Sequence, residues 1–251
     1  MFDTHAHLAD KRFDADRAQV IESALNEGIS GIICICSDFE RLKVFSHLIK
    51  SYDLVWGAVG VHPHDAIAYN TLKEKLDQVL KKDKIVALGE IGLDYYYKNS
   101  PPKIQKEVFS HQLSLAKKRN LPVIIHSREA MKDTLKILQD NKINQGVVHC
   151  FSGTEEEMKI CLEMGLYISL AGPLTFPKAS NLQKIASLIS LRRLVVETDS
   201  PYLAPQPVRG KRNQPAFVKY VLQKISFLRG ISEEKLTQIT SDNAKELFKL
   251  F

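Results

Sequence analysis

Eight short runs rich in valine and isoleucine recur along the 251 residues, and a helix-length segment follows each of them. Parallel strands that are covered on both faces read as such continuous apolar runs. Eight parallel strands close into a barrel that side chains can fill, and about 250 residues is typical of that fold. We therefore expect an α/β fold, a TIM (β/α)8 barrel. The expected strands are Phe2–His7, Gly31–Cys36, Trp56–Val61, Val86–Gly89, Val123–His126, Gly146–His149, Tyr167–Leu170 and Leu194–Glu197.

Amphipathic patterns between the runs predict the helices of this barrel, and a helix pair closes the chain. An open doubly wound sheet is the alternative architecture, but no glycine-rich phosphate loop follows the first run. No low-complexity linker or break in composition divides the chain, so residues 1–251 are expected to form one domain. The expected helices cover residues 14–27, 40–50, 71–82, 103–119, 129–141, 154–164 and 178–189, and then 214–229 and 232–249.

The composition predicts a cytoplasmic enzyme. A hydrophobic fraction of 44% can fill a large core, and no apolar stretch reaches the 18 or more residues of a membrane span. The first residues carry no basic, apolar leader, so a secretory signal is not expected. Four cysteines are too few for a disulfide framework in a chain of this length, so they are expected to stay reduced. The net charge of +6 is explained by solvated helix faces and does not by itself indicate nucleic-acid binding.

Six side chains that can bind a metal ion follow the apolar runs. The C-terminal ends of the strands of a parallel barrel meet at one mouth, where enzymes of this fold carry out their chemistry. Four imidazoles and two carboxylates exceed what one ion needs, so the pattern predicts a two-metal hydrolase. The six are His5, His7, Glu90, His126, His149 and Asp199.

His5 and His7 make the strongest local motif. Residues two apart on a strand point to the same face, so both imidazoles can bind one ion from one side. The alternative is a pair of incidental surface histidines near the chain terminus. Glu90 follows the apolar run 85–89, so its carboxylate is expected to be buried. A metal ion compensates a buried carboxylate, and a salt bridge to a lysine is the alternative.

His126 and His149 end the fifth and sixth runs. A single buried histidine is more often a hydrogen-bonded core residue than a ligand, but two at consecutive strand ends favour metal binding. Asp199 follows the eighth run, which lies beside the first in a closed barrel. Its carboxylate should therefore face His5 and His7.

Two further residues are candidates for substrate contact. His62 ends the third run at the same mouth, so we expect it to contact a phosphate rather than to make a structural hydrogen bond. Arg128 lies two residues past His126, where a helix is expected to begin. Its guanidinium can bind a phosphate through two parallel hydrogen bonds. The alternative is an ordinary surface ion pair with Glu129 or Asp133.

Aromatic and basic loops near the mouth leave two alternatives open. Tyr95, Tyr96 and Tyr97 follow Glu90 and either stack bases at the rim or pack the loop shut. The segment 209–213, Arg-Gly-Lys-Arg-Asn, follows the eighth run. It either positions a polyanion or forms a solvated turn.

Taken together, the motifs resemble those of the TatD family of metal-dependent deoxyribonucleases, in order from residue 2 to the C-terminus. A peripheral departure is Gln214, where family members commonly carry glutamate. The resemblance implies a barrel with two divalent ions, one held by His5 and His7 with Asp199. The second ion would be held by His126 and His149, and Glu90 would bridge the two. The motifs are Asp3-Thr-His-Ala-His-Leu, Gly60-Val-His-Pro-His, Gly89-Glu-Ile-Gly-Leu-Asp-Tyr-Tyr, His126-Ser-Arg, His149-Cys-Phe-Ser-Gly, Glu197-Thr-Asp-Ser-Pro-Tyr-Leu and Arg209-Gly-Lys-Arg-Asn.

The implied activity is cleavage of phosphodiester bonds, as a 3′-5′ exonuclease on single-stranded DNA, with Mg²⁺ or Mn²⁺ for turnover. The ions would convert a bound water to hydroxide, and Asp199 would accept its proton. Zn²⁺ also binds imidazole-rich sites tightly. The same ions would serve an ester or amide hydrolase such as an aminoacyl-tRNA deacylase, so the motifs alone do not separate these activities. A non-enzymatic scaffold is disfavoured, because structural metal sites are normally closed. DNA is the expected partner, with no membrane and no obligate protein partner.

Overall fold

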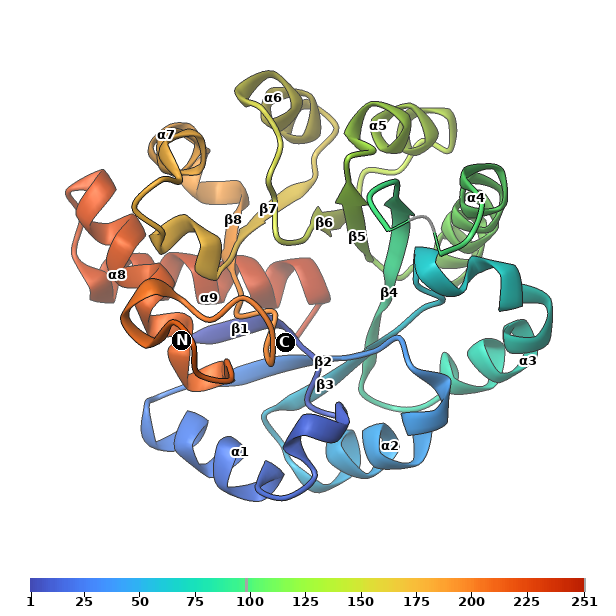
Figure 1. The fold of residues 1–251 in the computed structure, drawn as a ribbon, viewed down its shortest axis with the longest axis horizontal. Coiled ribbons are helices and arrows are strands. Elements are labelled where there is room, and N and C mark those ends of the chain that lie inside the picture. Colours follow the sequence, from blue (N-terminus) through green and yellow to red (C-terminus); the bar gives the residue numbers. More distant parts are fainter. Residues whose placement is uncertain (98, 251) are drawn as a thin grey trace.

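The computed structural model, which describes residues 1–97 and 99–250, is a barrel of parallel strands surrounded by helices (Figure 1). The eight strands pair in chain order, and every neighbouring pair is parallel. The expected barrel is thereby confirmed. The strands are β1 Phe2–Ala6, β2 Gly31–Cys36, β3 Val55–Val59, β4 Ile85–Asp94, β5 Val123–Arg128, β6 Gly146–Val148, β7 Tyr167–Leu170 and β8 Leu194–Val196.

The barrel closes between β1 and the loop that follows β8. The backbone N–H of His7 donates to the carbonyl of Ser200 at 2.7 Å, and the N–H of Asp199 donates to the carbonyl of His5 at 2.9 Å. Ala6 and Ser200 form an isolated parallel bridge. This closure holds Asp199 directly beside the His5–His7 pair.

The helices fall where the sequence predicts them, with small differences at their ends. The largest difference is at α8, expected from 214 but observed from Val218, because Pro215–Phe217 forms a separate 3-10 turn. No helix in the described chain has both the length and the apolar character that a membrane span requires. The helices are α1 Arg17–Asn26, α2 Leu42–Ser51, α3 Tyr69–Val79, α4 Pro102–Arg119, α5 Met131–Asp140, α6 Glu155–Glu163, α7 Ser180–Leu188, α8 Val218–Arg229 and α9 Glu233–Phe248.

Alternate residues of the strands face two separate apolar layers. One layer lies between the strands and the surrounding helices, and it includes Cys34 and Cys36 of β2. The other fills the inside of the barrel, and α9 covers it at the end opposite the mouth, behind the strands in Figure 1. The mouth is therefore the open end of the barrel. The strand residues of the inner layer are Phe2, Ile33, Ile35, Ala58, Ala87, Ile124, Val147, Tyr167 and Val195.

Strand β4 runs further than expected, through Gly92 to Asp94 instead of ending at Gly89. Gly92 has a φ of 145°, a conformation that side chains with a Cβ rarely adopt. A Cβ there would lie 2.0 Å from the carbonyl oxygen of His126. Glycine at this position therefore allows β4 to lie against β5 and to carry Glu90 and Asp94 on the same face.

Candidate metal centre

The structure brings the six predicted ligand side chains together at the mouth, with Glu90 at the centre. The Glu90 carboxylate is 3% exposed, so its surroundings determine its charge. Its oxygens lie between 2.7 and 3.8 Å from ring nitrogens of five histidines. No lysine or arginine of the described chain pairs with it, so the proposed alternative of a lysine salt bridge is wrong. The five histidines are His5, His7, His62, His126 and His149.

The two oxygens of Glu90 face different groups of histidines. Oε2 lies 3.6 Å from Nε2 of His5 and 3.8 Å from Nε2 of His7. Oε1 lies 2.7 Å from both Nδ1 of His126 and Nε2 of His149. A carboxylate placed in this way can contact two cations, one through each oxygen.

Asp199 completes the side of the centre that contains His5 and His7. Its Oδ1 lies 3.4 Å from Nε2 of His7 and 3.7 Å from Nε2 of His5. The residue adopts a left-handed conformation with a φ of 56°, which non-glycine residues adopt rarely and which recurs at functional sites. Burial alone would raise the pKa of Asp199, but the hydrogen bond from His7 and the neighbouring imidazoles lower it. Asp199 is therefore ionised at neutral pH.

The donor set fits divalent cations. Nε2 of His5 and Nε2 of His7 are only 3.2 Å apart, and both Glu90 and Asp199 present an oxygen to them. Neutral imidazoles and carboxylates are common ligands of divalent transition metals. Among the residues that the structure describes, three trios have ligand atoms close enough to share one ion, and two of these trios include Glu90. The trios are His5–His7–Glu90, His62–Glu90–His126 and His5–His149–Glu197.

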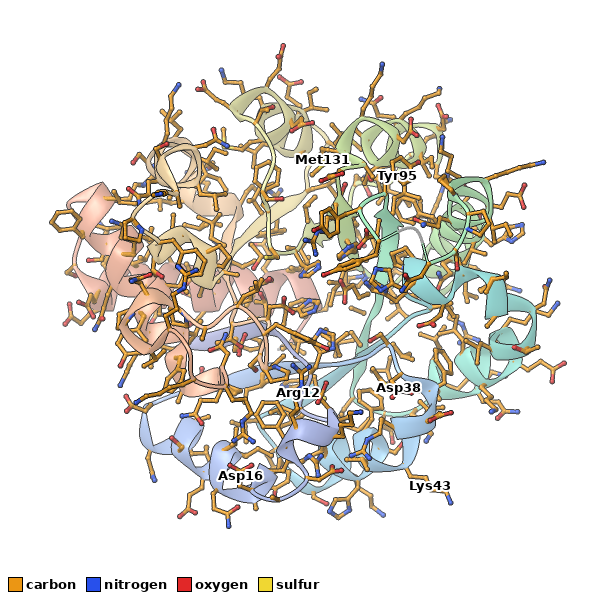
Figure 2. All side chains as sticks on the ribbon, in the orientation of Figure 1. Arg12, Asp16, Asp38, Lys43, Tyr95 and Met131 are labelled. Atoms are coloured by element: carbon orange, nitrogen blue, oxygen red, sulfur yellow. The ribbon has the colours of Figure 1, made fainter. Side chains whose placement is uncertain are left out.

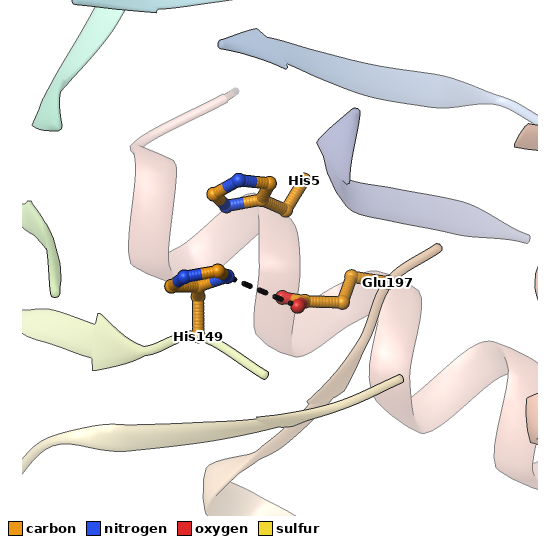
Figure 3. A group of neighbouring side chains, drawn as sticks. All are labelled: His5, His149 and Glu197. Carbon is orange, nitrogen blue, oxygen red and sulfur yellow. Dashed lines mark hydrogen bonds and ion pairs between the residues drawn. The ribbon is translucent and has the colours of Figure 1, made fainter. Parts of the chain in front are cut away.

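Two further buried carboxylates hold the histidines from behind. Nδ1 of His149 lies 3.2 Å from Oε1 of Glu197, as the dashed line in Figure 3 marks. Nε2 of His126 lies 3.2 Å from Oδ2 of Asp94. In each case one ring nitrogen faces Glu90 and the other faces an outer carboxylate. Such outer partners fix the tautomer and the orientation of a metal-binding histidine.

His5 lies flat against His149, with the ring centroids 4.0 Å apart and the rings 13° from parallel (Figure 3). Within the described residues, Nδ1 of His5 is buried and has no hydrogen-bond partner, and the same is true of Oε2 of Glu197. Buried polar atoms are rarely left unpaired, so these two atoms are available to a ligand of the centre.

The electrostatics of the cluster favour an ionised Glu90. Burial raises the pKa of this carboxyl, but the charge of His149 and the hydrogen bonds from His126 and His149 hold it well below its usual range. Burial lowers the pKa of His62 to about 4, so this imidazole is neutral near pH 7. A neutral His62 can donate a hydrogen bond or bind a cation.

The two residues expected to contact substrate differ in their distance from the metal centre. His62 lies past the end of β3, and its Nε2 is 3.5 Å from Glu90, so it borders the metal centre itself. Arg128 is the exposed last residue of β5, and α5 begins at Met131, two residues later than the expected start at 129. The alternative ion pair with Asp133 is wrong, because Asp133 binds Lys106.

The loops around the mouth divide between packing and exposure. The hydroxyl of Tyr95 donates to Asp133 at 2.8 Å, whereas Tyr96 and Tyr97 are 53% and 54% exposed. In the basic segment after β8, Arg212 makes two hydrogen bonds to Asp16. Tyr95 therefore packs the loop, Tyr96 and Tyr97 leave their rings open at the rim, and Arg212 is engaged within the protein.

The sequence analysis did not identify Asp94 and Glu197 as residues of the site, although the sequence contains a signal for each. Asp94 lies four residues after Glu90, and even spacing on a strand places both on one face. Glu197 follows the apolar run of β8 directly, as Glu90 follows the run 85–89. Because β4 was expected to end at Gly89, Asp94 was not placed on the same strand as Glu90.

Comparison with known proteins finds similarity to metal-dependent hydrolases along nearly the whole chain. The family model described as TatD related DNase matches residues 2–249. The uncharacterized metal-dependent hydrolase YabD of Bacillus subtilis (strain 168) is 41% identical over 255 residues, covering 100% of this chain and 99% of the relative. A Pectobacterium carotovorum protein named 3′-5′ ssDNA/RNA exonuclease TatD is 35% identical over 259 residues, covering 100% of both.

Solved structures agree with the sequence relatives. YJJV, a TatD homologue from Escherichia coli K12, has a TM-score of 0.92 and 28% identity, and the match covers 100% of this chain and 98% of that one. A hydrolase of the TatD family from Entamoeba histolytica has a TM-score of 0.89 and 26% identity, with coverages of 99% and 97%.

Proposed function

The chain belongs to the family of TatD-related DNases, metal-dependent hydrolases, and from this premise we propose that it removes nucleotides from the 3′ end of single-stranded DNA. The observation that supports the proposal is the placement of Glu90 between two groups of imidazoles at an open mouth. Relatives named as 3′-5′ ssDNA/RNA exonucleases support the choice of substrate. They favour it over the alternative of an aminoacyl-tRNA deacylase or another ester hydrolase.

In this proposal the centre binds two divalent ions. His5 and His7 with Asp199 would hold one, His126 and His149 the other, and Glu90 would bridge them. When bound, the ions lower the pKa of the attacking water and neutralise charge on the phosphate. Mg²⁺ or Mn²⁺ would support turnover, and Zn²⁺ would also bind the imidazoles.

The protein's own groups would orient the water and receive its proton. Asp199 is ionised, faces His7 and lies at the edge of the centre, so it can accept the proton of the attacking water. Phosphorus gains the hydroxyl, the bond to the 3′-oxygen breaks, and that oxygen takes up a proton. His62 would donate a hydrogen bond to the phosphate, and Arg128 would bind the substrate at the rim. We also propose a cytoplasmic location, where the four free cysteines would remain reduced.

The test is incubation of the Mn²⁺-loaded protein with 5′-labelled single-stranded DNA and, in parallel, with a panel of carboxylic and aminoacyl esters. We expect a ladder of products shortened from the 3′ end, which EDTA abolishes. Asp199→Asn serves as the inactive control, and Asp242→Asn, an exposed change on α9, as the active one. Ester hydrolysis without any cleavage of DNA would refute the proposal.

A further inference from the structure

Two arginine–tyrosine pairs flank the metal centre. The guanidinium of Arg12 lies over the ring of Tyr202, 4.0 Å from its centroid. The guanidinium of Arg128 lies over Tyr96 and Tyr97, 4.1 and 4.7 Å from their centroids. The two pairs are on different sides of the barrel: Arg12 follows β1, and Arg128 is the last residue of β5. Figure 2 labels Arg12 and Tyr95, and the two lie well apart in this view; Tyr95 is the residue before Tyr96.

Tyr202 borders the centre through His7, whereas Tyr97 is connected to it through His64, whose Nε2 lies 2.9 Å from Oδ2 of Asp94. The ring of Tyr202 is 5.7 Å from that of His7, edge to face, and the ring of Tyr97 is 5.3 Å from that of His64. The rings also remain open to solvent, since Tyr202 is 45% exposed and Tyr96 and Tyr97 are more than half exposed. Exposed aromatic rings beside a hydrolytic centre are suited to stacking against nucleic-acid bases.

The two pairs differ in charge. Arg12 makes two hydrogen bonds to its neighbour Asp10, at 2.9 and 2.8 Å, and this guanidinium lowers the pKa of Asp10 to about 2. Its charge is therefore already compensated. Arg128 is exposed and forms no ion pair with any carboxylate in the described part of the chain. Of these two guanidiniums, only that of Arg128 is free to pair with a phosphate.

A groove continues outward from Arg128. It lies between the loops that precede α5 and α6 and has a volume of about 680 Å³. Two of its acidic members are already engaged, because Asp133 pairs with Lys106 and Glu157 caps the first turn of α6. Glu129 is the remaining acidic residue that lines it. The groove therefore has room for a nucleotide next to the free guanidinium.

The two sides of the bond that a 3′-exonuclease cleaves also differ in charge. The terminal nucleotide carries a base, but its only phosphate is the one being cleaved. The rest of the strand carries one more phosphate for every nucleotide. We propose that the terminal base stacks on Tyr202, and that the next nucleotide places its base on Tyr96 and Tyr97 and its 5′-phosphate on Arg128. This assignment rests on the proposed nuclease function and fixes the direction of the strand across the mouth.

The test compares kcat/KM on dTpT, which has only the cleaved phosphate, with kcat/KM on dTpTpT, which has one more on the strand side. Arg128→Gln should lower the value for dTpTpT by roughly tenfold or more, the loss expected for one charge-assisted hydrogen bond. It should leave dTpT within about twofold, and Arg128→Lys should restore much of the loss. Arg192→Gln is the matched control, an exposed arginine that precedes β8 at the opposite end of the barrel.

Two substrate changes sharpen the test. A methylphosphonate in place of the strand-side phosphate should reproduce the loss, and Arg128→Gln should add nothing further on that substrate. Tyr202→Leu should lower dTpT and dTpTpT by the same factor, roughly five- to hundredfold, and should have no effect when the terminal base is absent. Phe227→Ala on α8, 80% exposed, is its control.

Equal losses on dTpT and dTpTpT for Arg128→Gln would overturn the assignment, because the residue would then support the centre itself. A length-dependent effect of Tyr202→Leu would overturn it as well. If the wild-type protein cleaves neither substrate but hydrolyses an ester, the proposed function fails and the strand direction fails with it. If the wild-type protein cleaves both dTpT and dTpTpT but either variant behaves in one of the two ways just described, the strand direction alone is refuted.

Discussion

At the scale of single residues, Asp199 is proposed both as a metal ligand and as the base. Its Oδ1 lies near both His5 and His7, while the loop after β8 holds its backbone against β1. Asp199→Asn keeps the shape and an oxygen donor but removes the charge and the basicity. We expect kcat to fall by roughly 10²–10⁴-fold at saturating Mn²⁺, with little change in affinity for DNA. Metal content is measured on the same sample, and turnover near the wild-type rate would mean that the base lies elsewhere.

His62 is the second residue whose role can be tested by mutation, because it is proposed to contact substrate but also lies beside Glu90. Its Nε2 is 3.5 Å from Glu90, and burial keeps its imidazole neutral by lowering its pKa to about 4. If it binds phosphate, His62→Ala should raise KM for DNA and leave the number of bound ions unchanged. Metal content of the purified variant separates the two roles. Loss of an ion would make His62 a ligand, as its trio with Glu90 and His126 allows.

The sequence identified the residues that end apolar runs but not the residues that hold them in place. His5, His7 and Glu90 were predictable because a strand end is recognisable and because imidazoles and carboxylates are rare at such positions. Asp94 and Glu197 act on imidazoles 32 and 48 residues distant in the chain. Such pairings depend on the register between neighbouring strands, which local spacing does not contain. The stacking of Arg128 on two tyrosines depends on the pairing of Asp94 with Arg128 between β4 and β5, which the expected end of β4 at Gly89 did not include.

At the scale of elements, α9 closes the barrel at the end opposite the mouth. Leu247 and Phe248 of this helix pack against the inner layer, and Phe248 is 2% exposed. Phe248→Ala should lower the free energy of unfolding by roughly 3–5 kcal/mol, because the inner layer cannot collapse into the space left. Phe227→Ala, in the exposed position on α8, should change it by less than about 0.5 kcal/mol. Urea denaturation measures both, and equal effects would show that α9 does not support the barrel.

The order of the elements was predictable because each strand of a filled barrel reads as an apolar run, whereas their ends were not. β4 continues past Glu90 only because Gly92 lets it approach β5. The closure between β1 and the loop after β8 uses backbone atoms around Ser200, and backbone hydrogen bonds leave no composition signal. The order of strands and helices is thus encoded in local sequence, whereas the ends of the strands and the closure of the barrel depend on contacts between distant segments.

At the scale of the whole molecule, the metal centre joins segments from both ends of the chain. Its proposed ligands come from β1, β4 and β5 and from the loops after β1, β6 and β8, so an ion bound there would hold together distant parts of the barrel. Because ions bind the folded state, they should stabilise it by about 2.7 kcal/mol per site at a free concentration of 100 times Kd. For a chain of this size that corresponds to a rise in Tm of roughly 5–10 °C per site.

We therefore expect removal of the ions with a chelator to lower Tm without unfolding the protein, and readdition of Mn²⁺ to restore it. Glu90→Gln should lose most of this response, because Glu90 contacts both groups of imidazoles, whereas Asp242→Asn on the exposed face of α9 should keep it in full. Calorimetry with and without Mn²⁺ measures the shift, and metal analysis of the same samples counts the ions. About two ions per wild-type chain with an unchanged Tm would show that the ions contribute to chemistry alone. A single ion per chain would instead refute the bridging role of Glu90.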